Sequence, residues 1–200
     1  SVPEASFLII KSSFGVVLHT GDFKIDKNPI LESSLDYKNL IKAIGGKPSL
    51  CVVDSTNMLN KNEGKSESFL REPITKIIKE SKGRVIFTSF ASNLGRLKII
   101  AEAGEKSGRS IAVFGRAMNN MLSKALETSI LTDFPTLIDP RKAHLLPREN
   151  LLVIATGSQG EIRAASAQLS RGKYMGLELE DGDTFVFSSK TIPGNEIAVN

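Results

Sequence analysis

The sequence predicts an α/β protein made of two units, the second of which is a parallel sheet flanked by helices. Three observations predict this fold class. Short, fully apolar runs alternate with amphipathic segments through the last two thirds of the chain, which is typical of buried parallel strands and their crossover helices. These runs end in small polar residues. The composition, 40% hydrophobic and 24% charged over 200 residues, is sufficient for a substantial core.

The first unit, residues 1–60, is expected to begin with a β-hairpin. Apolar runs at 7–10 and 16–18 flank residues 11–15, whose composition indicates a tight turn. A short amphipathic helix follows and should end at Gly45. The second strand of the hairpin would end just before Asp22, the first candidate site residue.

The apolar run 50–53 is the next expected strand, and Cys51 within it is expected to be buried. Cys51 is the only cysteine, which excludes a disulfide framework and a cysteine-based zinc site. A single buried cysteine favours a reducing compartment, so we expect a cytoplasmic protein. Residues 58–66 are polar and indicate a loop or a linker.

The second unit, residues 61–200, repeats helices and strands. Pro73 is expected to kink or restart its first helix. The expected helices lie at about 69–78, 94–106, 118–126 and 161–169, and the expected strands at 84–88, 110–114, 151–155 and 184–187.

Net charge and hydropathy limit the classes of function that are compatible with the sequence. The net charge of +4 and the pI of about 9.2 are mildly basic, which is compatible with a polyanionic partner but is weak support for one. No apolar run approaches ~18 residues, so we expect no membrane span. We also expect no signal peptide, and the chain does not begin with Met. We therefore expect an internal piece of a longer protein.

The loops after the strands of the second unit are a candidate site, because the carboxyl ends of parallel strands lie on one edge of a sheet. Amides, hydroxyls and arginines there suit the phosphates of a nucleic-acid backbone. The candidate residues are Ser89, Ser92, Asn93, Arg96, Arg116, Gly157, Ser158, Gln159 and Gly160. The alternative is that they are ordinary caps and turns, and that Arg96 braces its helix by pairing with an acidic residue.

Two aspartates of the first unit follow apolar strands, Asp22 after the hairpin and Asp54 after the run 50–53. Each is either a turn former that accepts hydrogen bonds from the next amides or a metal ligand or base presented by a sheet edge. At the ends of neighbouring strands they could converge in one crevice. His19 and His144 are expected to be structural or solvated.

Together these motifs resemble the metallo-β-lactamase superfamily, in its nucleic-acid-processing β-CASP branch, and within that branch the bacterial ribonuclease J family. The order and rough spacing agree along essentially the whole chain. The motifs are SVPE at 1–4, HTGDFK at 19–24, DSTN at 54–57, SE at 66–67, FASN at 90–93 with Arg96, GRAM at 115–118, TGSQGE at 156–161 and IPGNE at 192–196. Ala117 departs from the serine usual in the family.

The resemblance implies a zinc-dependent ribonuclease. Residues 1–60 would be part of the metallo-β-lactamase (αββα) domain, and residues 61–200 most of the β-CASP domain. Asp22 would bridge two zinc ions, and Asp54 would orient and charge a histidine that protonates the leaving oxygen. That histidine and most metal ligands would lie outside this chain, so we expect the chain alone to be inactive.

The resemblance also implies partners. The loop edge would hold the backbone of single-stranded RNA, in endonucleolytic cleavage and 5′-to-3′ exonucleolytic trimming during RNA maturation and decay. The complete protein is expected to be a homo-oligomer, with other RNA-decay proteins as further expected partners. Two alternatives remain open: a catalytically silent RNA-binding or scaffold paralogue of the same fold, and an acyl or thioester hydrolase. The β-CASP-type loops argue against the hydrolase.

Overall fold

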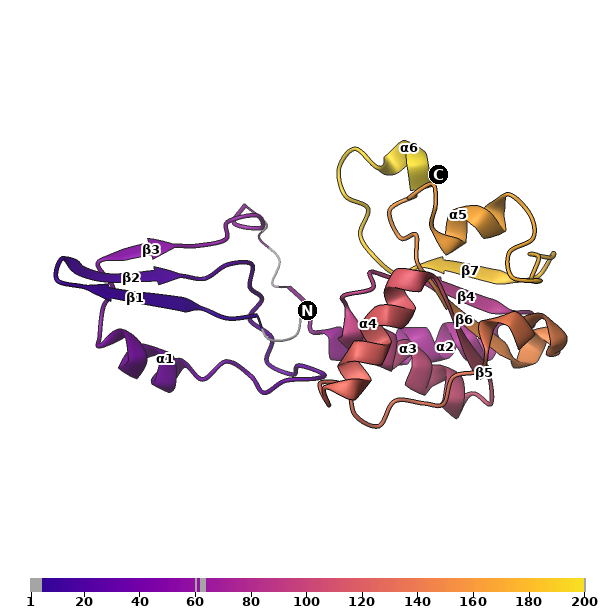
Figure 1. The fold of residues 1–200 in the computed structure, drawn as a ribbon, viewed down its shortest axis with the longest axis horizontal. Coiled ribbons are helices and arrows are strands. Elements are labelled where there is room, and N and C mark those ends of the chain that lie inside the picture. The colour runs from indigo at the N-terminus through magenta and orange to yellow at the C-terminus, as the bar shows by residue number, and fades with distance from the viewer. Residues whose placement is uncertain (1–4, 60, 62–63, 200) are drawn as a thin grey trace. The chain divides into compact units, whose positions relative to one another are not determined.

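The computed structural model describes residues 5–59, 61 and 64–199. The chain divides into two compact units, the first ending at Glu67 and the second beginning at Ser68 (Figure 1). The SVPE stretch at 1–4 lies outside the described residues. No helix in the described part of the chain combines the length and the apolar composition that a bilayer crossing requires.

The first unit contains the expected hairpin and helix. Strands β1 (Leu8–Ser12) and β2 (Gly15–His19) pair antiparallel. Helix α1 (Tyr37–Ile44) ends at Gly45, whose φ of 83° places it in the left-handed region that glycine tolerates. Strand β3 (Leu50–Val52) then pairs parallel to β2, so the sheet order is β1-β2-β3. The parallel pairing brings the carboxyl ends of β2 and β3 to one edge.

The expected burial of Cys51 is wrong, because its side chain is exposed. Its neighbours in β3 are exposed as well, Leu50 to 55% and Val52 to 45%. Among the described residues of the first unit, Ile44 is the only hydrophobic residue that is buried. An apolar run therefore predicted the strand correctly but did not show whether a second layer covers it.

The second unit is a four-stranded parallel sheet with the order β5-β6-β4-β7, which confirms the predicted fold class. Each strand is separated from the next in sequence by a helical segment, as the alternation predicted. Its elements are η1 (Glu67–Leu70), α2 (Arg71–Glu80), β4 (Val85–Thr88), α3 (Leu94–Lys106), β5 (Ser110–Phe114), α4 (Arg116–Glu127), η2 (Pro140–Leu145), η3 (Arg148–Asn150), β6 (Leu151–Ala155), α5 (Ala165–Ser170), β7 (Thr184–Phe187) and α6 (Glu196–Val199).

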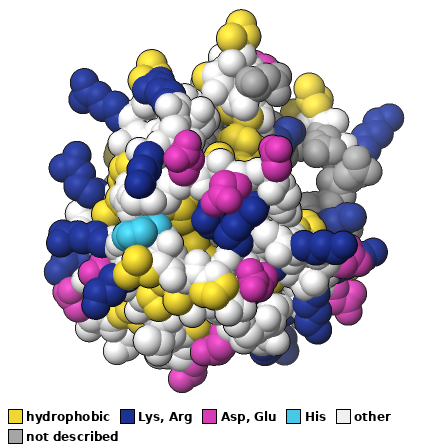
Figure 2. All heavy atoms as spheres, turned by 90° about the vertical axis from the view of Figure 1, so that its right-hand side faces the viewer, with side chains coloured by type: hydrophobic (Ala, Val, Ile, Leu, Met, Phe, Trp, Pro, Cys, Tyr) yellow, Lys and Arg dark blue, Asp and Glu magenta, His cyan; other side chains and the backbone are white. Residues whose placement is uncertain are grey.

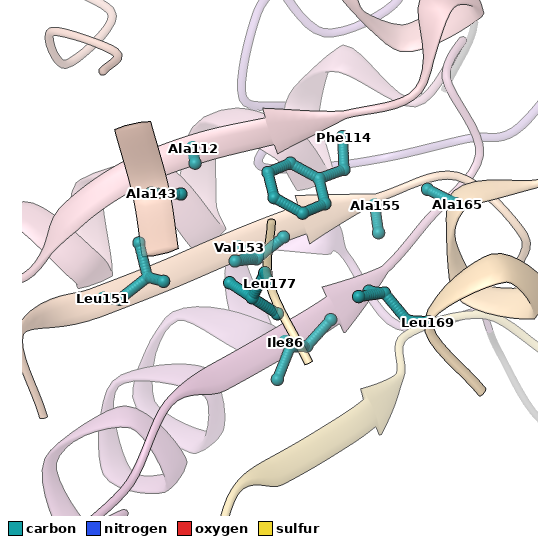
Figure 3. Close-up of a cluster of buried hydrophobic side chains, with 10 residues drawn as sticks. All are labelled: Ile86, Ala112, Phe114, Ala143, Leu151, Val153, Ala155, Ala165, Leu169 and Leu177. Atoms are coloured by element: carbon teal, nitrogen blue, oxygen red, sulfur yellow. The ribbon is translucent and has the colours of Figure 1, made fainter. Parts of the chain in front are cut away.

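Helical segments cover both faces of this sheet. On one face, residues from β4, β5, β6, η2 and α5, together with one residue of the segment between α5 and β7, form a buried cluster (Figure 3). Its members are Ile86, Ala112, Phe114, Ala143, Leu151, Val153, Ala155, Ala165, Leu169 and Leu177. On the other face, α3 approaches so closely that a Cβ on Gly104 would lie 2.3 Å from Leu152 Cδ2. Burial on both faces explains why these strands are continuous apolar runs.

Two helix boundaries differ from the prediction. The first helix of the second unit is a 3₁₀ turn, η1, followed by α2, so Pro73 lies in the first turn of α2, where its missing amide costs little. Helix α5 begins at Ala165 rather than near residue 161, because a turn precedes it in which the amide of Ala164 donates to the carbonyl of Glu161.

At the end of the second unit's sheet where the strands begin, the Asp183 carboxylate connects several chain segments. Its carboxylate, 4% exposed, accepts hydrogen bonds from the backbone amides of Arg84 and Glu180 at 2.9 and 3.0 Å. It also accepts from the guanidinium groups of Arg84 and Arg148 at 3.2 and 2.8 Å.

On the face shown in Figure 2, Lys and Arg side chains are interspersed with Asp and Glu, so this face presents no broad field of one sign.

Candidate functional site

The first unit presents both predicted aspartates at one sheet edge. His19 at the end of β2 is paired with Val52 at the end of β3, and Asp22 and Asp54 follow these residues. Thr20, which directly follows His19, is 6% exposed. The structure therefore places the two loops together, as the parallel pairing of their strands requires.

Thr20 links the two loops directly, and sequence reasoning missed it. Its amide donates to the carbonyl of Val52 at 3.0 Å. Its hydroxyl accepts from the amide of Asp54 at 3.2 Å and donates to the carbonyl of Gly21 at 2.8 Å. A threonine between an apolar strand and a glycine was the available signal. Because Thr20 bonds to both loops, it sets the position of Asp54 relative to Gly21, the residue that precedes Asp22.

The carboxylate of Asp54 is oriented by its own loop. Oδ1 accepts hydrogen bonds from the hydroxyl and the amide of Thr56, at 2.6 and 2.9 Å. These two bonds lower the pKa of Asp54 below its usual 3.8, so the group stays ionised at neutral pH. Asp54 lines an open hollow of about 340 Å³ together with Phe23, Val53, Ser55, Asn57 and Met58. Its turn-forming and functional interpretations are compatible, because Oδ1 forms the turn.

The carboxylate of Asp22 is exposed, and within the described residues it makes no hydrogen bond or ion pair. It is thus not held as a turn former. The chemistry fits one ligand of a metal site, because an ionised carboxylate with two accepting oxygens is available. The described residues include no group of three or more His, Cys, Asp and Glu able to hold an ion.

The two histidines lie in different units, His19 in the first and His144 in the second. His19 is exposed, and its Nδ1 accepts a hydrogen bond from the amide of Gly21 at 3.1 Å. His144 is exposed in η2 of the second unit, beside Gly176. His19 thus has a local structural contact, and His144 lies at the surface.

The second unit brings its four strand-end loops to one edge. Thr88, Phe114, Ala155 and Phe187 are paired in one row across the sheet. The residues that follow them are therefore neighbours: Ser89, Gly115, Thr156 and Ser188. Backbone bonds from Ser89, Thr156 and Ser188 continue the ladder by one residue. The edge on which the candidate phosphate-binding residues were expected thus exists as a continuous row.

Several candidate residues on this edge have structural partners. Asn93 caps α3 by accepting from the amide of Arg96 at 3.1 Å. Arg96 Nη1 donates to the carbonyl and hydroxyl oxygens of Ser188 at 2.5 and 2.8 Å. Ser89 and Ser158 are each only 2% exposed, and the Ser89 hydroxyl is without a hydrogen-bond partner among the described residues. Ser92 is half-buried, whereas Arg116 is exposed at the start of α4.

The TGSQGE loop is packed rather than open. A Cβ on Gly157, whose φ is 112°, would lie 1.7 Å from Ser166 Oγ, and that hydroxyl donates to the Gly157 carbonyl at 3.1 Å. A Cβ on Gly160 would lie 2.3 Å from the carbonyl oxygen of Ala198. These glycines therefore allow close packing between protein segments. A side chain at either position would disturb the fold before it obstructed a ligand.

Comparisons with known proteins agree with these motifs. The sequence profile described as "Ribonuclease J, beta-CASP domain" matches residues 82–200. Over its whole length the chain is 40% identical to Ribonuclease J of Sinorhizobium meliloti and to Ribonuclease J 1 of Streptococcus pyogenes, and it covers 36% of each. It is 34% identical to Ribonuclease J of Thermus thermophilus and covers 35% of it. The chain spans about a third of the length of the curated relatives it matches.

Proposed function

The chain belongs to the ribonuclease J family, and from this premise we propose that it is part of a metal-dependent nuclease that hydrolyses phosphodiester bonds of RNA. One observation carries the proposal beyond family membership. A carboxylate with no partner among the described residues, Asp22, and an oriented, ionised carboxylate, Asp54, follow two paired parallel strands at the same edge. This combination suits one metal ligand and one group that acts on a proton donor.

Asp22 is the proposed metal ligand. Its carboxylate oxygens would bind the metal, and as the bridging group Asp22 would contact two zinc ions. The remaining ligands would come from other parts of the complete protein. When bound, such ions supply positive charge that stabilises the transition state of phosphoryl transfer. Asp22 alone cannot hold two ions, because a stable site needs three or more protein ligands. We therefore expect this chain by itself to be inactive.

Asp54 is the proposed positioning group for general acid catalysis. Thr56 engages Oδ1, which leaves Oδ2 available to accept a hydrogen bond from a histidine of the complete protein. An ionised carboxylate raises the basicity of such a histidine and fixes its orientation. Asp54 is ionised at neutral pH, as this role requires, because its pKa lies below the usual 3.8.

The strand-end loops of the second unit are proposed to hold the backbone of single-stranded RNA. An exposed cation at this edge, Arg116 at the start of α4, suits contact with a phosphate group. The complete protein would then act as an endonuclease and a 5′-to-3′ exonuclease in RNA maturation and decay. We also propose a cytoplasmic location, a homo-oligomeric state and other RNA-decay proteins as partners.

The test is Asp22→Asn in the complete protein. Replacing a charged ligand by a neutral amide should abolish cleavage of a labelled RNA and lower the metal content measured by elemental analysis. Asp133→Asn is the matched control, because Asp133 is an exposed aspartate of the second unit whose positive φ of 51° an asparagine accepts. Full activity and full metal content of Asp22→Asn would refute the assignment.

The wild-type measurements of this experiment also test the alternative of a catalytically silent RNA-binding paralogue. A complete wild-type protein that binds RNA but neither binds metal nor cleaves RNA would be a scaffold. The absence of both RNA binding and cleavage would refute the proposed function altogether.

A further inference from the structure

The segment that follows β7, residues 188–195, is held by side chains from helix α3 and from the loop after β6. We call it the 188–195 loop. At its start, Arg96 from the first turn of α3 donates to both oxygens of Ser188. Along its length, Gln159 from the loop after β6 bonds to four different residues. The loop is thus attached to the rest of the sheet edge at several points.

Gln159 has a complete set of hydrogen bonds, although it is only 6% exposed. Its Nε2 donates to the carbonyl of Lys190 at 3.1 Å and to the hydroxyl of Ser189 at 3.4 Å. Its Oε1 accepts from the amide of Ile192 at 2.7 Å and from Asn195 Nδ2 at 3.3 Å. A primary amide offers two donors and two acceptor positions, so nothing is left with which Gln159 could bind RNA.

Lys190 is the residue that this arrangement presents. Its carbonyl is held by Gln159, and the hydroxyl of its neighbour Ser189 donates to the Ser158 carbonyl at 3.3 Å. Its side chain, in contrast, is exposed, and within the described part of the chain it makes no ion pair or hydrogen bond. The backbone at Lys190 is therefore fixed at the strand-end edge while its ammonium group is free.

We propose that Lys190 binds a phosphate of the RNA backbone and that Gln159 is the positioning residue that holds it in place. This inference rests on the proposed function. It assigns a phosphate contact to Lys190, which is not among the candidate residues identified from the sequence. An ammonium group on a fixed backbone loses less conformational freedom on binding than one on a free loop, so the contact is stronger.

The first experiment compares Lys190→Gln with the wild type in the complete, chelator-treated protein. A fluorescent single-stranded RNA is titrated over a salt series. Loss of one phosphate contact should weaken binding about five- to tenfold and reduce the slope of log K against log salt by about 0.7. Lys106→Gln is the control, because Lys106 is exposed at the end of α3, which runs back toward the edge where the strands begin. It removes the same charge without removing the proposed contact.

The second experiment is a double-mutant cycle with Gln159→Leu, with Gln168→Leu as the control for losing a glutamine amide. If Gln159 acts through Lys190, Gln159→Leu weakens RNA binding in the wild type but adds little in the Lys190→Gln background. A merely structural role would give equal effects in both backgrounds, and that result would overturn the positioning assignment.

The outcomes separate this inference from the proposed function. A wild-type protein that binds no RNA refutes the proposed function. A wild-type protein that binds RNA, with Lys190→Gln and Lys106→Gln indistinguishable in affinity and salt slope, refutes the Lys190 contact alone. Lys190→Gln changes only an exposed charge, so this comparison remains decisive even where Gln159→Leu does not fold.

Discussion

At the scale of single residues, the two aspartates differ in what surrounds their carboxylates. Asp22 has no partner in the described part of the chain, whereas Asp54 is oriented by Thr56 and lies in a loop anchored by Thr20. A free carboxylate suits a ligand, because it has no hydrogen bonds to give up on binding a cation. An oriented carboxylate suits a second group that must hold another side chain in one geometry. The roles are therefore distinguished by hydrogen bonding rather than by exposure alone.

We predict that Asp54→Asn in the complete protein slows RNA cleavage by about 10²- to 10⁴-fold, the usual scale for loss of general acid-base assistance. Metal content should stay near normal, because Asp54 is not a proposed ligand. Single-turnover cleavage and elemental analysis measure both quantities, with Asp133→Asn as the control. Loss of metal on this substitution would instead make Asp54 a ligand.

At the scale of elements, Asp183 connects the beginnings of β4 and β7 with η3. Burial alone would raise the pKa of Asp183, but hydrogen bonds from Arg148 and from the amides of Glu180 and Arg84 lower it below 3.8. A carboxylate whose folded-state pKa is lowered stabilises the fold above its unfolded pKa. That contribution is lost as the pH falls from about 3.8 through the folded value.

Asp183→Asn should therefore lower the free energy of unfolding by about 3–5 kcal/mol at neutral pH, the scale for breaking a buried ion pair. Urea titrations at pH 7 and at acid pH measure the loss and its expected decrease in acid. Asp181→Asn is the control, because Asp181 accepts a hydrogen bond from Arg148 through its backbone carbonyl, which the substitution keeps. Equal stability of both variants at pH 7 would contradict the role of Asp183.

The elements were predictable from the sequence because their signals are local. The apolar runs, Gly45 and the period of α3 each specify a strand, a helix end or a helix without reference to distant residues. The exposure of Cys51 and the burial of Gln159 were not predictable, because both depend on segments that the fold brings, or does not bring, against them. The burial of Ser158 was not predictable for the same reason: the sequence showed Ser158 after a strand but not the packing that buries it.

At the scale of the whole molecule, the two units differ in burial. The side chains of β4 and β6 are almost completely buried, whereas β1 and β3 carry exposed apolar side chains such as Leu8 and Leu50. Burial of apolar surface is the main source of stability. The second unit should therefore be much the more stable in this chain.

We predict that amide hydrogen exchange in the 200-residue chain is slower in β4 and β6 than in β1 and β3 by about two orders of magnitude or more, since local opening free energies follow burial. Exchange measured by mass spectrometry on peptides from each strand checks this difference. The central β2, hydrogen-bonded on both sides, is the internal reference for the first unit. Equal protection of the two sheets would contradict the argument.

The strand order β5-β6-β4-β7 has a consequence for synthesis on the ribosome. Of the four strands of this sheet, β4 and β5 are synthesised first, yet they are not neighbours. Ile86 of β4 pairs with Val153 and Phe185, both of which are synthesised much later. The space between β4 and β5 is filled only when β6 arrives, and β7 completes the other side of β4 last. Such long-range pairing delays folding and leaves apolar strand edges open to chaperones or to aggregation while translation continues.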